Sequence, residues 1–575
     1  MKKITVSITI FCLAIATGCS DKFLDVQPKA ALAVTVLQNK AGVNSLLIGA
    51  YSLLDGWATP EGAYRSYQSS ADNWVFGSVA SDDAYKGTIA GDQPPISLIE
   101  QGNIQSDNIY FRGKWRSAYD GIARSNDVLQ AVAVAKDMTD AEKAQVIAES
   151  RFLRGHYHFE LKKMFNMVPY IDEKTYNPND LESTKQPNSS DIWPNIVADL
   201  KAAYDVLPAK QTQVGRPTKW AAAALLGKAY MFQKKYAEAK TLLEAVVASG
   251  QYRLMDRYHD NFKAVTNNNA ESIFEVEHSV NDGASGGENG NVGATLNYPY
   301  GGGGVTTCCG FFQPSQNLVN AFKTDANGLP LLDTFNATDI TNDQGIESTA
   351  SFAPYTGTVD PRLDWTVGRR GIPFLDWGVH PGKAYVRDQS YGGPYSPKKH
   401  VMYRSDVGTN TFAGNPRLNA NNYRMIRYSH VLLWLAEIEV EIGDLNKART
   451  YVNQIRKRAS NPDGFVKNAD GTAAANYVVK EYSASWADQA TARKAVQFEE
   501  RLEFGMEGHR RFDLVRWGIA DQTLNSYYTA ESSKRIYLKG VTFTKGKHEY
   551  FPIPIQEIFN SKVNGKETLQ QNPGY

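Results

Sequence analysis

Two segments far apart in the chain repeat one spacing of large and small residues. One starts at Ala223 and the other at Leu432. At this spacing, small residues let two antiparallel helices approach and large residues fill the space between them. The first segment carries Leu226, Gly227, Tyr230, Tyr236, Ala239, Leu243 and Val246, and the second carries Leu435, Ala436, Glu439, Leu445, Ala448, Val452 and Ile455. A chain that contains both is predicted to be mostly α-helical.

The spacing follows the tetratricopeptide pattern, in which one helical pair cannot bury its apolar face alone. Further helices must therefore stack on each pair. Helical periodicity places candidates at 115–134, 141–165 and 192–207. The middle one has apolar stripes on two sides and ends before Pro169, which cannot continue a helix. The predicted fold is a tetratricopeptide-like helical superhelix.

The segment between the two helical pairs has a different composition. Residues 281–420 hold 21 of the 46 glycines of the chain, with little helical periodicity. We expect an inserted loop-rich lobe with short strands, and such an insertion is a common place for a binding site. The predicted domains are 19–280, a helical region with tetratricopeptide-like units, the insertion 281–420, and a second such helical region, 421–575.

The N-terminus carries an export signal. Lys2 and Lys3 precede an apolar run, 4–16, which is too short to span a membrane, and small residues lead directly to Cys19. This arrangement resembles the site at which bacterial lipoprotein signals are cleaved and the new N-terminal cysteine is lipidated. Residues 1–18 are therefore predicted to be a signal peptide and Cys19 the lipidation site. The alternative is an ordinary secretory signal cut nearby, with Cys19 as a free thiol.

Charge and cysteine content exclude several classes of partner. Lys and Arg number 62 against 61 Asp and Glu, which argues against nucleic acid and against a polybasic membrane patch, and we expect that the ligand is not a polyanion. Beyond the signal, no stretch approaches 18 consecutive apolar residues, so the lipid is the expected membrane anchor. After cleavage only adjacent Cys308 and Cys309 remain besides Cys19. They form either a vicinal disulfide or two thiols, and a secreted setting favours oxidation.

Several strings of the chain resemble the SusD/RagB family of outer-membrane lipoproteins of the Bacteroidetes. They are CSDKFLDVQPK at 19–29, RFLRGHYHFELKKMFNMVPYI at 151–171, FQPSQNLVNAF at 312–322, RFDLVRWG at 511–518 and YFPIPIQEI at 550–558. The resemblance implies a protein on the cell surface, anchored by lipid to the outer membrane, that captures an oligosaccharide or polysaccharide. It also implies delivery of that glycan to a SusC-like TonB-dependent transporter. Peptide binding, as in RagB-like proteins, and a tetratricopeptide adaptor that binds only proteins are the alternatives.

Glycan binding needs exposed aromatic faces together with rigid hydrogen-bonding groups. The first candidate cluster, 66–87, contains Asp72, Asn73 and Trp74, and the family resemblance places it on the binding face. The alternative is that Trp74 anchors the loop in the core. For Asp82 and Asp83 we expect helix capping or a structural divalent ion such as calcium, the one cofactor considered.

Two further clusters lie in the loop-rich insertion. In 296–312, Tyr300 is a candidate for stacking, and Cys308 and Cys309, if oxidised, offer a flat contact surface. In 360–400, Arg370 and Tyr395 are candidates for ligand contact. The alternatives are a tight structural turn in the first segment and, in the second, arginines paired with Asp364 and Asp376 and aromatic residues facing the transporter.

Catalysis is not predicted. No hydrolase, metalloprotease or nucleotide-binding motif stands in a suitable context. His156 and His158 are two residues apart on a helix and point away from each other, which does not suit a metal pair. Glu499 and Glu500 are expected on a solvated, salt-bridged helix face. The chain is predicted to be a binding protein and not an enzyme.

Overall fold

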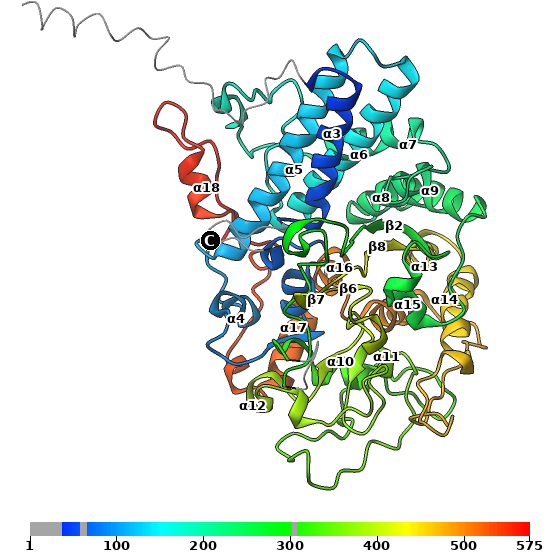
Figure 1. Cartoon of the computed structure of the whole chain (residues 1–575). Helices are drawn as coiled ribbons and strands as arrows, with labels where there is room; N and C mark the ends of the chain where they lie inside the picture. The colour runs from blue at the N-terminus through cyan, green and yellow to red at the C-terminus, as the bar shows by residue number, and fades with distance from the viewer. Residues whose placement is uncertain (1–36, 58–65, 302–306) are drawn as a thin grey trace, which may run out of the picture.

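The computed structural model describes residues 37–57, 66–301 and 307–575 (Figure 1). The predicted signal 1–18 and the predicted lipidation site Cys19 lie outside the described residues. Helices dominate, and the few strands form two-stranded sheets, so the predicted mostly α fold with a loop-rich lobe is confirmed. Within the described ranges, no helix has the length and apolar character needed to cross a membrane.

The first long helices pack side by side in the upper part of Figure 1. They are α3 (Lys40–Tyr51), α5 (Ile109–Val134), α6 (Asp140–Phe165) and α7 (Trp193–Val206). A capping box starts α6, because Thr139 Oγ1 accepts from the Glu142 N–H and the Glu142 carboxylate accepts from the Thr139 N–H. From Val146 onward nearly every α6 residue is buried, because α5 covers one side and α7 the other.

The two repeat-like segments fold as helical pairs. The first is α8 (Lys219–Phe232) with α9 (Tyr236–Ala248), and the second is α13 (Tyr428–Ile442) with α14 (Leu445–Ala459). A Cβ atom on Gly227 would lie 2.9 Å from Leu243 Cδ2, so glycine is what permits α8 and α9 to approach this closely. Helix α9 also packs on α13, so the two units stack directly on each other.

The loop-rich lobe begins and ends at paired strands. Strand β2 (Ser272–Val276) is antiparallel to β8 (Tyr423–Arg427), and the chain between them forms much of the lower part of Figure 1, beside α17 and other C-terminal elements. The domain boundaries at 280/281 and 420/421 stay predictions, but both fall close to this strand pair. The lobe contains β3 (Phe311–Pro314), α10 (Gln316–Ala321), α11 (Leu363–Thr366), β4 (Val367–Gly368), α12 (Gln389–Gly392), β5 (Ser396–Pro397), β6 (Thr411–Phe412) and β7 (Asn415–Asn419).

The lobe is joined to the helical part by a second strand pair. Strand β1 (Ala84–Gly87), from the N-terminal region, is antiparallel to β3 of the lobe. Helix α4 (Pro94–Glu100), also from the N-terminal region, packs on β1. The C-terminal part adds α15 (Gln489–Phe504), α16 (Arg510–Trp517), α17 (Ala520–Glu531) and α18 (Ile555–Asn560).

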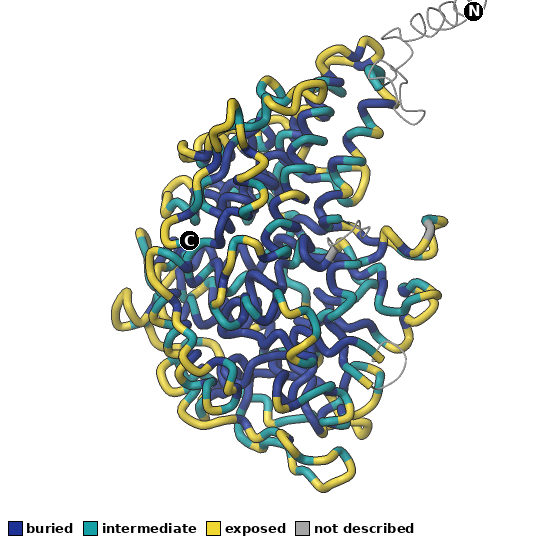
Figure 2. The backbone as a smooth tube through the Cα atoms, turned by 90° about the vertical axis from the view of Figure 1, so that its left-hand side faces the viewer, coloured by how far each residue is buried: buried dark blue, intermediate teal, exposed yellow. Residues whose placement is uncertain are grey.

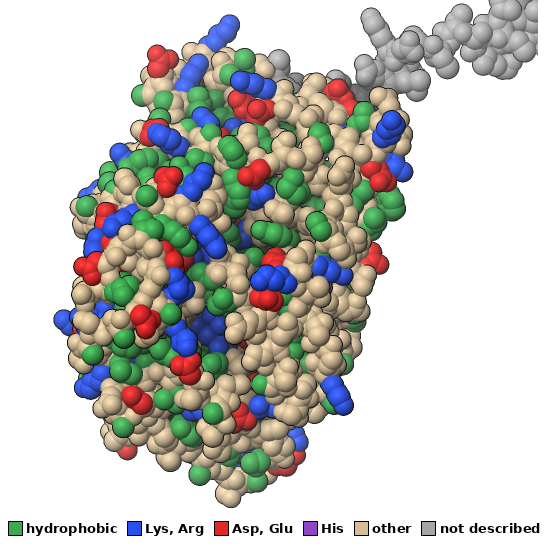
Figure 3. Space-filling model, turned by 180° about the vertical axis from the view of Figure 1, so that it is seen from behind, with side chains coloured by type: hydrophobic (Ala, Val, Ile, Leu, Met, Phe, Trp, Pro, Cys, Tyr) green, Lys and Arg blue, Asp and Glu red, His purple; other side chains and the backbone are tan. Residues whose placement is uncertain are grey.

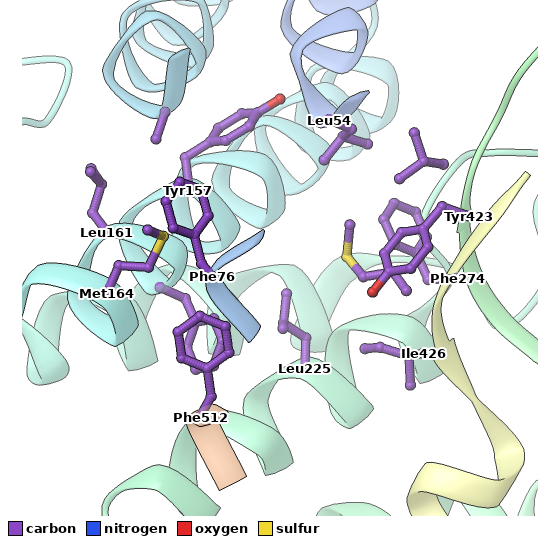
Figure 4. Packing of buried hydrophobic residues seen from close by; sticks show 14 of the residues in the cluster. Leu54, Phe76, Tyr157, Leu161, Met164, Leu225, Phe274, Tyr423, Ile426 and Phe512 are labelled. Carbon is purple, nitrogen blue, oxygen red and sulfur yellow. The ribbon is translucent and has the colours of Figure 1, made fainter. Parts of the chain in front are cut away.

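One continuous core crosses these regions. Figure 2 shows buried backbone through the middle of the molecule, with exposed residues mainly at its rim. Figure 4 shows how side chains from distant parts of the sequence meet there: Phe76 lies beside Phe512, and Leu225 lies between this pair and Ile426. The lobe is therefore part of the same folded body as the helices.

A buried ionic network also joins the lobe to the C-terminal helices. Arg362 of the lobe pairs with Glu499 and Glu503 of α15 at 2.7 and 3.1 Å. Glu499, Glu500 and Glu503 are almost completely buried, so the prediction of a solvated face for Glu499 and Glu500 is wrong. Each carboxylate is instead matched by a buried arginine, and Arg516 pairs with Glu500 at 3.2 Å.

Candidate functional site

Trp74 lies in the core, and the prediction of an exposed aromatic surface at this residue is wrong. Its side chain is 1% exposed, and its ring lies 6.2 Å from Phe311 and 5.6 Å from Phe312, measured between centroids. The turn that carries it, a single π-helical turn over Trp74–Val79, packs on the backbone of Gly508. Trp74 instead anchors its loop in the core, as the alternative interpretation expected. Trp74 supports strand β3 from beneath.

Asp72 and Asn73 also turn inward. Asn73 is buried, and its amide donates to Glu160 at 3.0 Å. Asp72 is half-buried and accepts from the Ser70 hydroxyl at 2.6 Å, and burial raises the pKa of its carboxyl. These contacts hold the start of the Trp74 turn. Neither side chain is placed on an open surface in the way that we predicted.

Asp82 and Asp83 precede strand β1, so the prediction that they cap a helix is wrong. Both are buried and both pair with Arg501 of α15, while Asp82 also pairs with Arg510. Guanidinium groups therefore balance the two carboxylates. The described residues contain no group of three or more His, Cys, Asp and Glu side chains that suits a metal ion. A divalent ion such as calcium stays an untested prediction.

Tyr395 and Arg370 are held by the protein itself. Tyr395 is 1% exposed and donates to Gln316 Oε1 at 3.0 Å, so it presents no stacking face. Arg370 is buried, pairs with Asp343 at 3.9 Å and donates to Ser348 and Ala350 carbonyls. The predicted ligand contacts at these two residues are therefore not available in this structure. Arg369 pairs with Asp364 at 2.6 Å, as the alternative interpretation expected.

Tyr300 and the two cysteines, in contrast, meet at one partly open surface. Tyr300 is half-buried, and the guanidinium carbon of Arg387 lies 5.1 Å from its ring centroid. Arg387 Nη1 donates to Asp92 Oδ2 at 2.6 Å and to Thr88 Oγ1 at 2.9 Å. The side chains of Arg387 and Asp92 are 28% and 32% exposed. We call this group, with the adjacent cysteine pair, the Tyr300 face.

A disulfide joins Cys308 to Cys309 across a cis peptide bond, which settles the choice between a disulfide and two thiols. Cys308 is half-buried and Cys309 is 8% exposed. Next to them Gly310 brings the backbone close to the face: a Cβ atom on it would lie 3.4 Å from Tyr300 Cβ and 3.6 Å from Arg387 Cβ. With φ at 76°, this position favours glycine. The disulfide thus lies directly beside Tyr300.

The sequence interpretation missed Thr88, Asp92 and Arg387. Asp92 and Arg387 lie 295 residues apart, and each stands in a loop segment without a recognisable motif. Their meeting depends on the β1–β3 pair, because the Thr88 N–H donates to the Gly310 carbonyl at 2.6 Å just beyond that pair. The available signal was weak: Asp92 stands beside Gly and Pro in GDQPP, and Arg387 stands between Val386 and Asp388 in YVRDQ.

The Tyr300 face combines the groups that recognise hydroxyl-rich molecules. An aromatic ring offers a flat apolar surface to C–H groups, while a guanidinium donates and a carboxylate accepts hydrogen bonds. The ion pair holds both charged groups in place before any ligand arrives. Within the described residues, the face pairs no nucleophile with a general base.

The back of the molecule has a different character. Figure 3 shows acidic and basic side chains interspersed over this side, and basic side chains at the bottom of a hollow. Positive and negative side chains alternate over this surface and do not form separate patches. This side therefore offers no broad field of one charge.

Comparison with known proteins gives consistent results along the chain. A model described as "SusD family" matches residues 270–575, and one described as "Starch-binding associating with outer membrane" matches residues 22–231. A SusD-like protein of Formosa agariphila is 24% identical, with 97% of each chain covered. The starch-binding protein SusD of Bacteroides thetaiotaomicron is 24% identical over 76% of this chain and 74% of that protein.

Solved structures share the fold. A SusD superfamily protein from Bacteroides vulgatus has a TM-score of 0.68 at 22% identity, covering 94% of this chain and 100% of that one. Surface glycan-binding protein A from Bacteroides thetaiotaomicron, solved in complex with laminarihexaose, has a TM-score of 0.64 at 22% identity, covering 93% and 99%. The family match spans more than half of the chain and the fold agrees over nearly all of it. The chain therefore belongs to the SusD family.

Proposed function

We propose that this protein captures an oligosaccharide at the Tyr300 face on the outside of the outer membrane. The observation that carries the proposal is the grouping of Tyr300, Arg387 and Asp92 at a partly open surface beside the disulfide. A sugar ring stacks on the tyrosine, and its hydroxyls bond to the ion pair. Family membership supports this assignment, since similar proteins are described as binding laminarin or starch.

Delivery to a partner completes the proposed function. The captured glycan passes to a SusC-like TonB-dependent transporter, and lipid on Cys19 keeps the protein beside it at the outer membrane. The description of the family that matches residues 22–231 supports association with that membrane. The protein acts by binding and transfer, without an enzymatic step. Labelling with a lipid precursor tests the anchor: wild-type protein takes up label and Cys19→Ala does not.

Glycan binding is tested by calorimetry against a panel of plant, fungal and host polysaccharides, with peptides as a further group. Tyr300→Ala is the informative variant, and we expect it to weaken binding about tenfold. Tyr204→Ala is a matched control, because Tyr204 is also half-buried with a cation, Lys219 Nζ, 4.9 Å from its ring centroid. Peptide binding without glycan binding would refute the proposal, and so would equal affinity of wild type and Tyr300→Ala.

A further inference from the structure

A second arginine borders the Tyr300 face on the other side of the disulfide. Arg417 Nη1 donates to Cys309 Sγ at 2.9 Å and to the Thr295 carbonyl at 3.1 Å. Its strand, β7, is held in place, because the Tyr298 hydroxyl donates to the Arg417 carbonyl at 3.3 Å. Gly310 follows Cys309 in the chain, and a Cβ atom on it would lie 3.4 Å from Tyr300 Cβ. Arg417, the disulfide and Tyr300 thus form one continuous strip.

Arg417 differs from its neighbours in having no anionic partner. In the described ranges it forms no ion pair with a carboxylate, whereas Arg387 pairs with Asp92, Arg370 with Asp343 and Arg424 with Glu275. The two hydrogen bonds of its guanidinium both come from Nη1 and go to neutral acceptors. Burial lowers the pKa of Arg417, as expected for a cation that has lost water without gaining an anion.

A half-buried, uncompensated guanidinium favours an anionic ligand group. Removing a charge from water is costly unless an opposite charge replaces the solvent. The nitrogens Nε and Nη2 of Arg417 make no hydrogen bond within the described residues, and this edge of the guanidinium fork matches carboxylate or sulfate oxygens in a bidentate geometry. The half-buried position of Arg417 leaves part of the side chain open to a ligand.

We propose that Arg417 selects glycans that carry an anionic group, a uronic acid carboxylate or a sulfate ester, on a sugar unit bound next to the disulfide. This inference rests on the proposed function, because it names the class of glycan that the Tyr300 face accepts. It departs from the expectation that the ligand is not a polyanion. That expectation came from the net charge, which averages the whole surface, whereas Arg417 acts at a single place.

The test compares each acidic oligosaccharide with its own neutral form by calorimetry. One arm uses oligogalacturonate and its carboxyl-reduced derivative, and the other uses a sulfated galactan oligosaccharide and its desulfated form. We expect at least one acidic oligosaccharide to bind about tenfold tighter than its neutral form, because one charge-assisted hydrogen-bonding contact contributes a difference of about that size. The arm that shows the difference identifies the anion as carboxylate or sulfate.

Two variants and one control tie this difference to Arg417. Arg417→Gln should remove the preference for the acidic form and leave affinity for the neutral form within about twofold. Arg417→Lys should retain part of the preference, because the positive charge stays while the bidentate guanidinium is lost. Arg253→Gln is the control: its side chain is 65% exposed, lies outside the face and pairs with Asp256. Thermal melting of each variant verifies that the fold is kept.

The outcomes separate this inference from the function on which it depends. The role of Arg417 is overturned if wild type binds acidic and neutral forms equally, or if Arg417→Gln keeps the preference for the acidic form. In both cases the proposed glycan-binding function is unaffected. Tighter binding of the acidic form that disappears only in Arg417→Gln supports it. Failure to bind any glycan of either arm, with binding of peptides, overturns both the inference and the proposed function.

Discussion

Arg510 donates from Nε and Nη2 to the two carboxylate oxygens of Asp82, at 2.8 and 3.0 Å. This bidentate contact joins the start of helix α16 to the residues directly before strand β1. Arg501 of α15 adds a second guanidinium to the same carboxylate at 3.1 Å. Because β1 pairs with β3, and β3 follows Gly310, these ion pairs fix the base on which the Tyr300 face is built.

Asp82→Asn should destabilise the protein by about 3–5 kcal/mol at neutral pH, since it leaves two buried arginines short of an anion. Burial alone would raise the pKa of Asp82, but Arg501 and Arg510 outweigh it and lower the pKa to about 2, from 3.8. The stabilising contribution is therefore complete above pH 4 and is lost as pH falls toward 2. Urea unfolding at pH 7 and pH 3 measures it.

The control for this experiment is Asp256→Asn, at a side chain that is 84% exposed. We expect that substitution to change the free energy of unfolding by less than about 1 kcal/mol. A difference in unfolding free energy between wild type and Asp82→Asn that is the same at pH 3 and pH 7 would contradict the assigned role of Asp82.

Trp74→Ala should cost about 3–5 kcal/mol of stability, because it leaves a cavity beneath Phe311 and Phe312. Trp74→Phe fills most of that space and should cost less. If Trp74 acts only as a support, the Phe variant keeps glycan affinity within about twofold of wild type. Calorimetry on Trp74→Phe checks this, and a large loss of affinity with an unchanged melting temperature would return Trp74 to the binding site.

The helices were predictable because their signal is local. Residues three and four positions apart share one helix face, so α6, α8, α9, α13 and α14 could be placed from the sequence. Exposure of aromatic residues was not predictable in the same way. Trp74 stands among polar residues in the sequence, yet the β1–β3 pair places Phe311 and Phe312 against it. That contact depends on segments far apart in the chain, since Thr88 and Gln313 at this pair are separated by 225 residues.

In the candidate site too, residues with an unusual local sequence were predictable, whereas contacts between distant segments were not. Tyr300 and the cysteine pair were found because aromatic and cysteine residues among glycines are unusual in themselves. Asp92 and Arg387 were missed because their role exists only where two distant loops meet. Arg370 was selected for its chemistry, but a guanidinium in a loop is equally suited to Asp343, and only the fold shows which partner is near.

Glu503→Gln should destabilise the lobe and the helices together. Glu503 is buried and pairs with Arg362, Arg427 and Arg458, which hold the pKa of its carboxyl well below the usual range despite burial. Loss of this charge leaves the arginines undercompensated and should cost about 3–5 kcal/mol. Hydrogen exchange should rise both around Arg362 in the lobe and along α15. Faster exchange confined to one of them would show that the network does not couple the two regions.

Glu100→Gln should stabilise the protein above neutral pH. Burial raises the pKa of Glu100 from 4.5 to about 7, although the Lys86 N–H and the Tyr537 hydroxyl donate to its carboxylate and act in the opposite sense. A raised pKa means that wild-type stability falls as pH rises from about 4.5 to 7, on the order of 3 kcal/mol in total. Glutamine carries no charge, so the variant should lose this decline. Melting curves at pH 5 and pH 8 measure it, and an equal decline in both proteins would contradict the assignment.

The ion pair of the Tyr300 face should matter for binding far more than for folding. Arg387 and Asp92 are partly exposed, and such pairs contribute only about 0–1 kcal/mol to stability. Arg387→Gln and Asp92→Asn should therefore leave the melting temperature nearly unchanged. Each should still weaken glycan binding about tenfold, because each removes a charged hydrogen-bonding group held toward the ligand.

The double variant Arg387→Gln/Asp92→Asn distinguishes two ways in which the pair acts. If each side chain contacts the ligand separately, the two losses add in free energy. If Asp92 acts only by orienting Arg387, the double variant binds no more weakly than Arg387→Gln alone, since the group that Asp92 positions is already gone. Calorimetry on the three variants with one glycan decides between these cases. Wild-type affinity in all three would remove the ion pair from the binding surface and leave Tyr300 and the disulfide as its remaining part.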